Sequence, residues 1–254
     1  MEGKPLVSII VNCYNGENFL EDCITSIKNQ TYKNWEVIFW DNFSTDKSKD
    51  IIIKFKDPRI KYFKAKKFTS LYEARNLAIE HSSGKYISFL DTDDIWTKDK
   101  ISKQLDFFNT NKEFDIVYSN YYLLQKNNLK IQFKKKLPVG EITQKLINYY
   151  SIGVITVMLK RKIFENYKFN KEFNIIGDFD FFINISKNFK IGCIQEPLAA
   201  YRIHKKNYSL LNLKEHVDEL ETWLKNNKNS KFILYRQRMN LIKLKLKLIL
   251  QKIL

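Results

Sequence analysis

The sequence predicts an α/β protein with a mostly parallel central sheet, flanking helices and a C-terminal helical tail. Two observations carry this prediction. Apolar runs of strand length alternate with segments whose apolar residues recur at helical spacing, which is typical of βαβ units. Polar side chains also gather directly after three of the apolar runs, and in open α/β sheets ligands bind at the carboxyl ends of the strands.

The first two strands are predicted from continuous apolar runs. Residues 6–14, LVSIIVNCY, form a β-branched run typical of a strand buried on both faces. Residues 16–30 follow with apolar side chains at helical spacing. Residues 35–40, WEVIFW, give the second strand, and Ser44 is the predicted N-cap of a helix that continues to Phe55.

The next two strands complete the pattern. Residues 59–64, RIKYFK, give the third strand, and residues 70–84 give a helix for which Gly84 is the predicted stop signal. Residues 85–90, KYISFL, give the fourth strand. Four strands that alternate with three helices predict a parallel sheet with right-handed crossovers.

An acidic cluster follows the fourth strand directly. Asp91, Asp93 and Asp94 place three carboxylates within four residues, and mutually repelling charges are not the normal end of a buried strand. Carboxylates tolerate such crowding when they share a divalent cation, and oxygen ligands suit Mg²⁺ or Mn²⁺. We therefore expect a divalent cation and a phosphorylated ligand at this edge of the sheet.

The alternative is a purely structural role for these carboxylates. Aspartate after a strand is common as turn chemistry or as a helix N-cap, and Asp94 or Thr97 could cap the helix predicted over residues 98–108. The whole D-x-D-D pattern fits a ligand site better, because polar residues end two other strands as well. These residues are Asn12, Tyr14, Asn15, Asp41 and Asn42.

Length and composition set the class of protein. The chain has 254 residues, of which 44% are hydrophobic, and this suffices for the core of one large domain or of one and a half domains. No run of about 18 apolar residues is present, and the first residues lack the features of a secretory signal. The three cysteines lie far apart, which predicts reduced thiols in an intracellular, cytoplasmic protein. The net charge of +16 indicates anionic partners.

Several segments resemble family 2 glycosyltransferases, which have the Rossmann-like GT-A fold. They are VSIIVNCYN, QTYKNWEVIFWDNFSTD, EARNLAIEHSSGKYISFLDTDD and YRIHKKNYS, and the resemblance is collinear over about residues 5–210. It implies a catalytic domain over residues 1–210, with a nucleotide-binding half (about 1–120) and an acceptor half (about 121–210). Residues 211–254 would then form a basic and aliphatic helical extension.

The resemblance implies an inverting, metal-dependent enzyme (EC 2.4). Such an enzyme transfers a sugar from a nucleotide-diphospho-sugar to a glycan or lipid-linked acceptor, and we expect this one to act at the inner face of a bacterial membrane in surface-polysaccharide biosynthesis. The implied cofactor is Mn²⁺ or Mg²⁺, with Asp93 as a ligand, and Asp91 contacts the ribose or the metal shell. The other residues that match nucleotide-binding positions are Asn12, Tyr14, Asp41, Asn42 and Arg75.

The chain departs from the family pattern at two of these positions. Asn12 stands where the family often has proline, which is tolerable because the contact there is largely made by the backbone. Asn42 replaces the second aspartate of a pair near the base, and its amide is both a donor and an acceptor, so the nucleotide preference stays open.

Transfer with inversion needs a general base for the acceptor hydroxyl, and the segment IIGDFDFFINIS supplies a candidate. Family members often have E-D-x-D here, with the first shared aspartate as the base. Gly177 replaces the usual glutamate, while Asp178 retains the aspartate. Asp180 is two residues further along and points to another helix face. The alternative is that Asp178 only caps the helix predicted over residues 179–189.

The loop YRIHKKNYS supplies two further candidates. Arg202 is assigned to the diphosphate, and His204 is assigned to the metal, because either side chain could reach these groups when the loop closes. A lone histidine is also commonly structural, and that alternative stays open for His204.

The C-terminal tail carries much of the charge. No acidic residue follows Glu221, whereas nine basic residues do. Residues 232–254 predict a helix with apolar surface on two sides. This helix could lie on an anionic bilayer as a peripheral membrane contact, or pack on the catalytic domain or on a second subunit of a homo-oligomer. Nucleic acid is not an expected partner, because the mainly aliphatic tail lacks the interleaved aromatic and basic pattern that base stacking needs.

Two rival functions remain from the sequence. A D-x-D phosphotransferase also places aspartates after a strand, but it would need Thr or Val shortly after the second aspartate, and DTDDIW fits this poorly. A non-catalytic nucleotide-sugar-binding or membrane-associated homologue would keep the same motifs without the chemistry.

Overall fold

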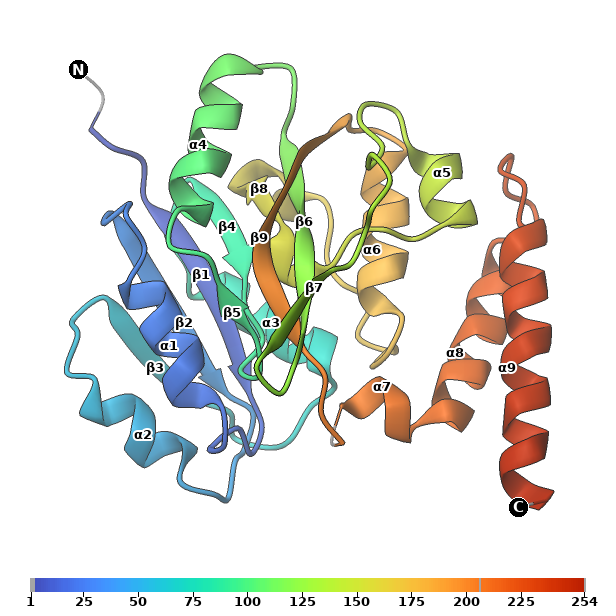
Figure 1. Ribbon diagram of the computed structural model, residues 1–254, viewed down its shortest axis with the longest axis horizontal. Helices are drawn as coiled ribbons and strands as arrows, with labels where there is room; N and C mark the ends of the chain where they lie inside the picture. The colour runs from blue at the N-terminus through green and yellow to red at the C-terminus, as the bar shows by residue number, and fades with distance from the viewer. Residues whose placement is uncertain (1–2, 206, 254) are drawn as a thin grey trace.

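The computed structural model describes residues 3–205 and 207–253 (Figure 1). Within this part of the chain, helices flank one nine-stranded sheet in which eight strands run in the order β3-β2-β1-β4-β8-β6-β9-β5 and β7 pairs with β6. The α/β fold predicted from the sequence is confirmed.

The first half of the sheet is parallel, as predicted. β1 (Val7–Cys13) lies between β2 (Trp35–Asp41) and β4 (Tyr86–Phe89), and β3 (Ile60–Lys64) pairs with β2. Every residue of β1, β2 and β4 is buried, which explains their continuous apolar sequences. The helices that follow the first three strands are α1 (Leu20–Lys28), α2 (Ser48–Lys54) and α3 (Leu71–Glu80).

Two helix boundaries differ from the prediction. α2 begins at Ser48, so Ser44 is not its N-cap, and the Ser44 hydroxyl instead accepts a hydrogen bond from the Asn15 backbone N–H at 3.0 Å. α3 ends at Glu80, before Gly84. A Cβ at Gly84 would lie 2.6 Å from the backbone nitrogen of Ser8. Glycine is therefore needed there because β1 passes so closely, not because a helix stops.

The second half of the sheet adds antiparallel pairings. β8 pairs antiparallel with β4 and β6, β5 with β9, and β7 with β6, while β6 and β9 are parallel. These strands are β5 (Ile95–Trp96), β6 (Ile116–Gln125), β7 (Asn128–Ile131), β8 (Met158–Lys160) and β9 (Ile191–Arg202). The helices of this half are α4 (Lys100–Thr110), α5 (Thr143–Asn148), α6 (Gly177–Ser186) and two 3₁₀ turns (Val154–Thr156 and Arg161–Glu165).

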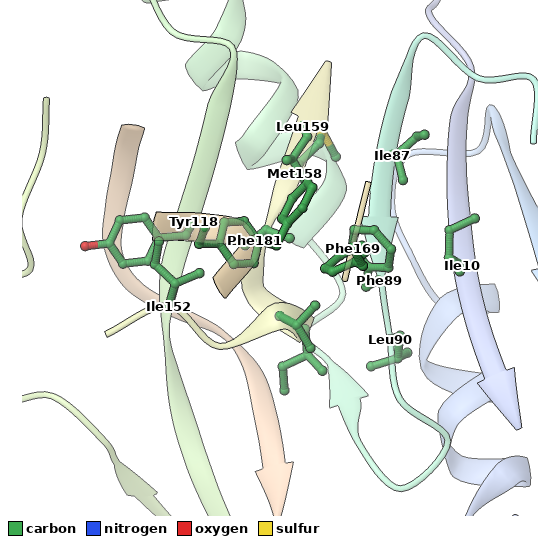
Figure 2. Close-up of a cluster of buried hydrophobic side chains, with 14 of the residues drawn as sticks. Ile10, Ile87, Phe89, Leu90, Tyr118, Ile152, Met158, Leu159, Phe169 and Phe181 are labelled. Carbon is green, nitrogen blue, oxygen red and sulfur yellow. The ribbon is translucent and has the colours of Figure 1, made fainter. Parts of the chain in front are cut away.

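A continuous apolar core joins the two halves (Figure 2). Ile10 and Phe89 come from the parallel strands, Met158 comes from β8, and Phe181 comes from α6. The Phe169 and Phe181 rings are stacked with their centroids 4.2 Å apart. This packing fixes α6 against the end of the parallel sheet.

Three helices complete the chain: α7 (Tyr208–Leu211), α8 (Leu213–Asn226) and α9 (Tyr235–Ile253). α9 lies alongside α8 and also contacts α5 (Figure 1). Gln237 of α9 is buried and donates a hydrogen bond to the Ile147 carbonyl at 2.5 Å. The predicted tail helix is therefore present, and one of its sides packs on the rest of the molecule. Within the described ranges, no helix is both long and apolar enough to cross a bilayer.

Candidate functional site

A cavity of about 1040 Å³ opens where β1, β2 and β4 end. It brings together eight of the ten site residues predicted from the sequence: Asn12, Tyr14, Asn42, Arg75, Asp91, Asp93, Asp178 and His204. These residues come from four strand ends and two helices, so the fold collects them as the parallel-sheet prediction requires. Asp41 and Arg202 do not line the cavity.

Arg75 and Asp91 form a largely buried ion pair. The Nη2 atom of Arg75 lies 2.6 Å from Oδ1 of Asp91, and the Arg75 side chain is only 2% exposed. Burial acts to lower the pKa of the Arg75 guanidinium, but the carboxylate of Asp91 more than compensates and raises it. Arg75 is therefore a fixed positive charge in the wall of the cavity.

Asp93 and His204 face each other in the cavity. Nε2 of His204 lies 2.8 Å from Oδ2 of Asp93, although the two residues are 111 positions apart. Burial raises the pKa of the Asp93 carboxyl, the neighbouring Asp91 raises it further, and the contact with His204 opposes both effects. A positive group at this point would relieve the repulsion between the two carboxylates.

Arg202 binds the acidic loop, the segment that carries Asp91, Asp93 and Asp94, on the side away from the cavity. Its backbone N–H donates to Oδ1 of Asp94 at 2.7 Å, its Nε donates to the Asp93 carbonyl at 2.8 Å, and its Nη2 pairs with Asp22 at 2.9 Å. The Oδ2 atom of Asp94 is buried and has no hydrogen-bond partner among the described residues. Burial raises the pKa of Asp94 well above its usual range, so a neutral carboxylic acid fits this position.

Two exposed aromatic rings also line the cavity. Tyr14 and Phe68 are 54% and 55% exposed, and their ring centroids lie 4.7 Å apart. Nearby, the amide of buried Asn12 has no partner for Nδ2 among the described residues. An unpaired buried donor facing a cavity is suited to an acceptor on a ligand.

Asn42 and Asp41 are engaged by the protein itself. Nδ2 of Asn42 donates to the Thr69 carbonyl at 2.9 Å, and Oδ1 of Asn42 accepts from the Thr69 hydroxyl at 2.9 Å. Asp41 accepts from the Tyr62 hydroxyl at 2.6 Å and from the Ser44 N–H at 2.7 Å. Thr69 thus engages the amide oxygen of Asn42 and one of its amide hydrogens, and these bonds fix the loop that carries Phe68 and Thr69.

Asp178 lies in the first turn of α6, one residue after Gly177. Its Oδ1 accepts hydrogen bonds from the Phe179 N–H at 2.7 Å and from the Tyr72 hydroxyl at 3.3 Å. Burial raises the pKa of Asp178, and the charge of Arg75 acts against that rise. The N-cap of α6 is Ile176, so Asp178 is not the cap that the structural alternative required.

The glycine before Asp178 has a steric explanation. A Cβ at Gly177 would lie 2.3 Å from the ring of Tyr72. Tyr72 therefore occupies the space that any larger residue at position 177 would need, and the same ring presents its hydroxyl to Asp178.

Helix α8 contacts the backbone just before the first turn of α6. The Glu219 carboxylate accepts hydrogen bonds from the backbone N–H groups of Asn174, Ile175 and Ile176, at 2.6, 3.0 and 2.9 Å. A carboxylate at a helix N-terminus satisfies donors that the helix leaves unpaired and interacts favourably with the helix dipole. α8 thereby fixes the segment from which Asp178 projects.

The residues at the acidic loop fit a divalent cation. No cluster of three or more His, Cys, Asp or Glu side chains that could hold a metal ion occurs among the described residues. Mg²⁺ sites commonly have one or two carboxylates, with ligand phosphates completing the shell. The carboxylates of Asp91 and Asp93, which line the cavity, match that incomplete type of site, and Nε2 of His204 lies 2.8 Å from Oδ2 of Asp93.

Several cavity residues were not predicted. Tyr72 could have been found, because it lies three residues before Arg75 on one face of α3, whereas nothing local marks the others. The hydroxyl groups of Tyr150 and Ser151 are buried and have no hydrogen-bond partner among the described residues. The unpredicted residues with polar or aromatic side chains include Phe68, Thr69, Tyr72, Tyr121, Tyr150, Ser151 and Tyr201.

Both a family model and curated relatives that are similar to this chain are glycosyltransferases. The family model "Glycosyl transferase family 2" matches residues 8–185. The glycosyltransferase WfaP of Escherichia coli, described as a UDP-Glc:alpha-D-GlcNAc-diphosphoundecaprenol beta-1,3-glucosyltransferase, is 36% identical over 214 residues, which are 83% of this chain and 82% of WfaP.

Solved structures share the fold at low sequence identity. TarS 1–349 of S. aureus in complex with UDP-GlcNAc superposes with a TM-score of 0.70 and 15% identity, covering 94% of this chain and 71% of that structure. The mannosyltransferase PcManGT of Pyrobaculum calidifontis, in complex with GDP-Man and Mn²⁺, gives a TM-score of 0.68 and 14% identity, covering 94% and 70%. At these identities the likeness shows the fold alone.

Proposed function

The chain belongs to glycosyl transferase family 2, and from this membership we propose that it is an inverting, metal-dependent enzyme that transfers a sugar from a nucleotide-diphospho-sugar to a lipid-linked glycan. The observation that carries the proposal is the convergence of Asp91, Asp93, Asp178 and His204 on one cavity. The E. coli relative described above acts on a diphosphoundecaprenol-linked sugar, which supports the choice of acceptor and a place at the inner face of the cytoplasmic membrane.

The donor nucleotide binds at the part of the cavity that Tyr14 and Phe68 line. The two exposed rings are suited to stacking on a base, and stacking accepts any base. The free amide of Asn12 supplies a hydrogen bond to the nucleotide. Asn42 acts on the base only indirectly, by holding the Thr69 segment in place.

Asp93 and His204 would hold a divalent cation, and Asp91 would lie beside them. When bound, the cation stabilises the negative charge that develops on the leaving nucleoside diphosphate. Arg75 orients Asp91 and adds a positive charge beside the site. Arg202 does not contact the donor. It holds Asp93 and Asp94 in position through its hydrogen bonds to both residues.

Asp178 is the general base. The acceptor hydroxyl oxygen forms a bond to the anomeric carbon while the bond from that carbon to the donor phosphate oxygen breaks. The hydroxyl proton passes to the Asp178 carboxylate, and the nucleoside diphosphate leaves. The raised pKa of Asp178 suits this role, since a carboxylate in an apolar setting is a stronger base than one in water.

A thermal-shift screen of UDP-, GDP-, CMP- and dTDP-sugars, with and without Mn²⁺, tests the donor and the cation together. We expect one nucleotide class to raise the melting temperature when Mn²⁺ is present, and Asp93→Asn to abolish this stabilisation. The matched control is Asp106→Asn at an exposed position of α4, which should respond as the parent does. Stabilisation of Asp93→Asn equal to that of the parent would remove the metal assignment, and no response to any donor would remove the proposed function.

A further inference from the structure

Helix α9 has two apolar faces, and the protein uses only one. The inner face consists of Leu234, just before the helix, with Gln237, Leu241, Leu244 and Leu248. Leu234 and Gln237 are buried, and Leu241 and Leu244 pack against the core. This spacing of three or four residues places the inner face along α8 and α5 (Figure 1).

The opposite side of α9 is also apolar. At about 100° per residue, the side chains of this outer face fall within an arc of roughly 100°. The outer face consists of Tyr235, Met239, Ile242, Leu246, Ile249 and Leu250. All but Met239 are at least half exposed: Tyr235 is 67% exposed, Ile242 50%, Leu246 56%, Ile249 53% and Leu250 60%. An aliphatic stripe of this length left open to water is unusual for a monomeric protein.

Basic side chains border the outer face on both edges. Arg236, Lys243 and Lys247 lie along one edge, and Arg238 and Lys245 lie along the other. α9 has no acidic residue. Of these five cations, Lys245 forms an ion pair with Glu221 of α8, and the structure records no ion pair for the other four within the described residues. An apolar stripe between two basic rows is the pattern of a helix that lies in a membrane interface.

Helix α7 and the C-terminal end of α9 lie at one end of the molecule. The carboxyl ends of β1 and β2 lie at the same end, at the bottom of the view in Figure 1. Leu211 of α7 is 65% exposed. Tyr208 of α7 is also exposed, and it lines the cavity.

We propose that the outer face of α9 docks on an anionic lipid surface, with the aliphatic side chains in the headgroup region and the basic rows on the lipid phosphates. The proposal rests on the proposed function, because it explains how a lipid-linked acceptor reaches the cavity. Pairing with the same face of a second copy fits less well, since a two-fold contact would bring the like-charged basic rows together. The net charge of +16 is complementary to an anionic bilayer.

Vesicle sedimentation of the full chain tests the proposal without any substrate. We expect the parent to bind vesicles of phosphatidylcholine with about a third phosphatidylglycerol, and to bind pure phosphatidylcholine roughly tenfold or more weakly, because each basic residue near an anionic surface adds to binding. Ile242→Gln combined with Leu246→Gln should reduce binding to the mixed vesicles by roughly tenfold or more, because it removes the central aliphatic contacts. Lys243→Gln combined with Lys247→Gln should weaken binding and reduce its sensitivity to salt.

The matched control is Ile53→Gln on α2, which removes an equally exposed isoleucine (54%) far from α9. It should sediment as the parent does, and all variants should keep the parent's melting temperature because the altered side chains are exposed. Equal vesicle binding by the Ile242→Gln/Leu246→Gln variant and the parent would overturn the proposal. So would a dimeric parent that the same variant converts to a monomer, because the outer face would then be a subunit interface.

Site-specific labelling gives a second, direct measurement. The three native cysteines are buried, so Leu246→Cys can be labelled selectively with an environment-sensitive dye. The dye at position 246 should shift to the blue and be quenched by brominated lipids, whereas a dye at Ile53→Cys should not change. No quenching at position 246 would contradict the proposal. Donor stabilisation by nucleotide-sugars, measured without vesicles, reports separately on the proposed function.

Discussion

Asp178 is the residue on which the proposed chemistry depends most. Asp178→Asn keeps the hydrogen-bonding shape of the side chain but removes the base, so the rate of transfer should fall by roughly 10²-fold or more while donor affinity stays within a few-fold. In the parent, the rate should decline as the pH falls through the raised pKa of Asp178, because the protonated carboxyl accepts no proton. Steady-state kinetics over a range of pH measure both effects.

Asp180 supplies the control for that experiment. It lies two residues further along α6, where its Oδ1 accepts a hydrogen bond from Nε1 of Trp223 at 3.0 Å. Asp180→Asn retains this acceptor, so the variant should keep most of the activity. An Asp178→Asn enzyme with parental turnover would exclude the base role, and an equal loss of donor binding would move Asp178 to the donor site.

Glu36 gives a prediction about stability. Burial would raise its pKa, but the ion pair with Lys61 at 2.7 Å and hydrogen bonds from Ser8 and Ser83 lower it from 4.5 to about 2. A pKa lowered on folding stabilises the protein above the unfolded value, and this contribution is lost as the pH falls from about 4.5 toward 2. After allowance for screening at exposed Lys61, it amounts to about 2 kcal/mol.

Urea unfolding of Glu36→Gln at several pH values measures this contribution. At pH 7 the variant should unfold with a free energy about 2 kcal/mol below that of the parent. The gap should narrow as the pH falls below about 4.5, because the parent then loses the same interaction. A gap that stays constant down to pH 3 would show that the charge of Glu36 is not the source of the stability.

Helices α6 and α8 act together at the scale of elements. Glu219 is the single side chain that accepts from three successive backbone N–H groups before α6, and it is 7% exposed. Glu219→Gln leaves one acceptor oxygen for three donors, so the first turn of α6 should loosen. We expect a loss of about 1–3 kcal/mol in stability and a several-fold fall in kcat with little change in donor affinity.

A comparison with Glu215→Gln separates the effect of Glu219 on the position of Asp178 from its effect on the stability of the protein. Glu215 also lies on α8 but accepts from the Asn174 side chain and from Tyr208, not from the α6 backbone. A Glu215→Gln variant should therefore keep the pH profile of the parent. If Glu219→Gln were as active as the parent despite the lost stability, α8 would be a support for the fold and not a positioning element for Asp178.

At the scale of the whole molecule, the C-terminal helices divide into two roles. α8 holds the segment before Asp178, whereas α9 covers α8 and α5. We propose that the catalytic unit extends through α8 to Asn226, beyond the boundary at residue 210 expected from the sequence. α9 then contributes packing and the outer face.

Two shortened chains test this division. A chain that ends at Ser230 loses the buried side chains of Leu234 and Gln237, so its melting temperature should fall by roughly 10 °C, but it should still bind the donor and transfer to a soluble acceptor. A chain that ends at Leu211 also loses Glu219, and it should lose transfer. Full activity of the shorter chain would restore the boundary at residue 210, and inactivity of the longer chain would make α9 part of the catalytic unit.

The parallel half of the sheet and the position of Asp91, Asp93 and Asp94 could be predicted from sequence patterns. Local patterns suffice there, because a buried strand is a continuous apolar run and because parallel strands end at the same edge, where Asn12, Asn42 and Asp91 then meet. The spacing of the apolar residues also predicted helix α9 and its two apolar sides.

Which polar groups are available to a ligand depends on contacts between distant segments, and the sequence patterns did not predict these contacts. Asn42 is tied to Thr69, Tyr72 fills the space at Gly177 and reaches Asp178, and Glu219 holds the start of α6. The tertiary structure also decided which side of α9 packs on the fold and which stays exposed. The apolar pattern of a segment reflects how its residues divide between core and water, so it predicts the segment's own structure. These contacts, in contrast, join residues from 27 to 106 positions apart. Their geometry therefore depends on how the helices and strands pack against one another.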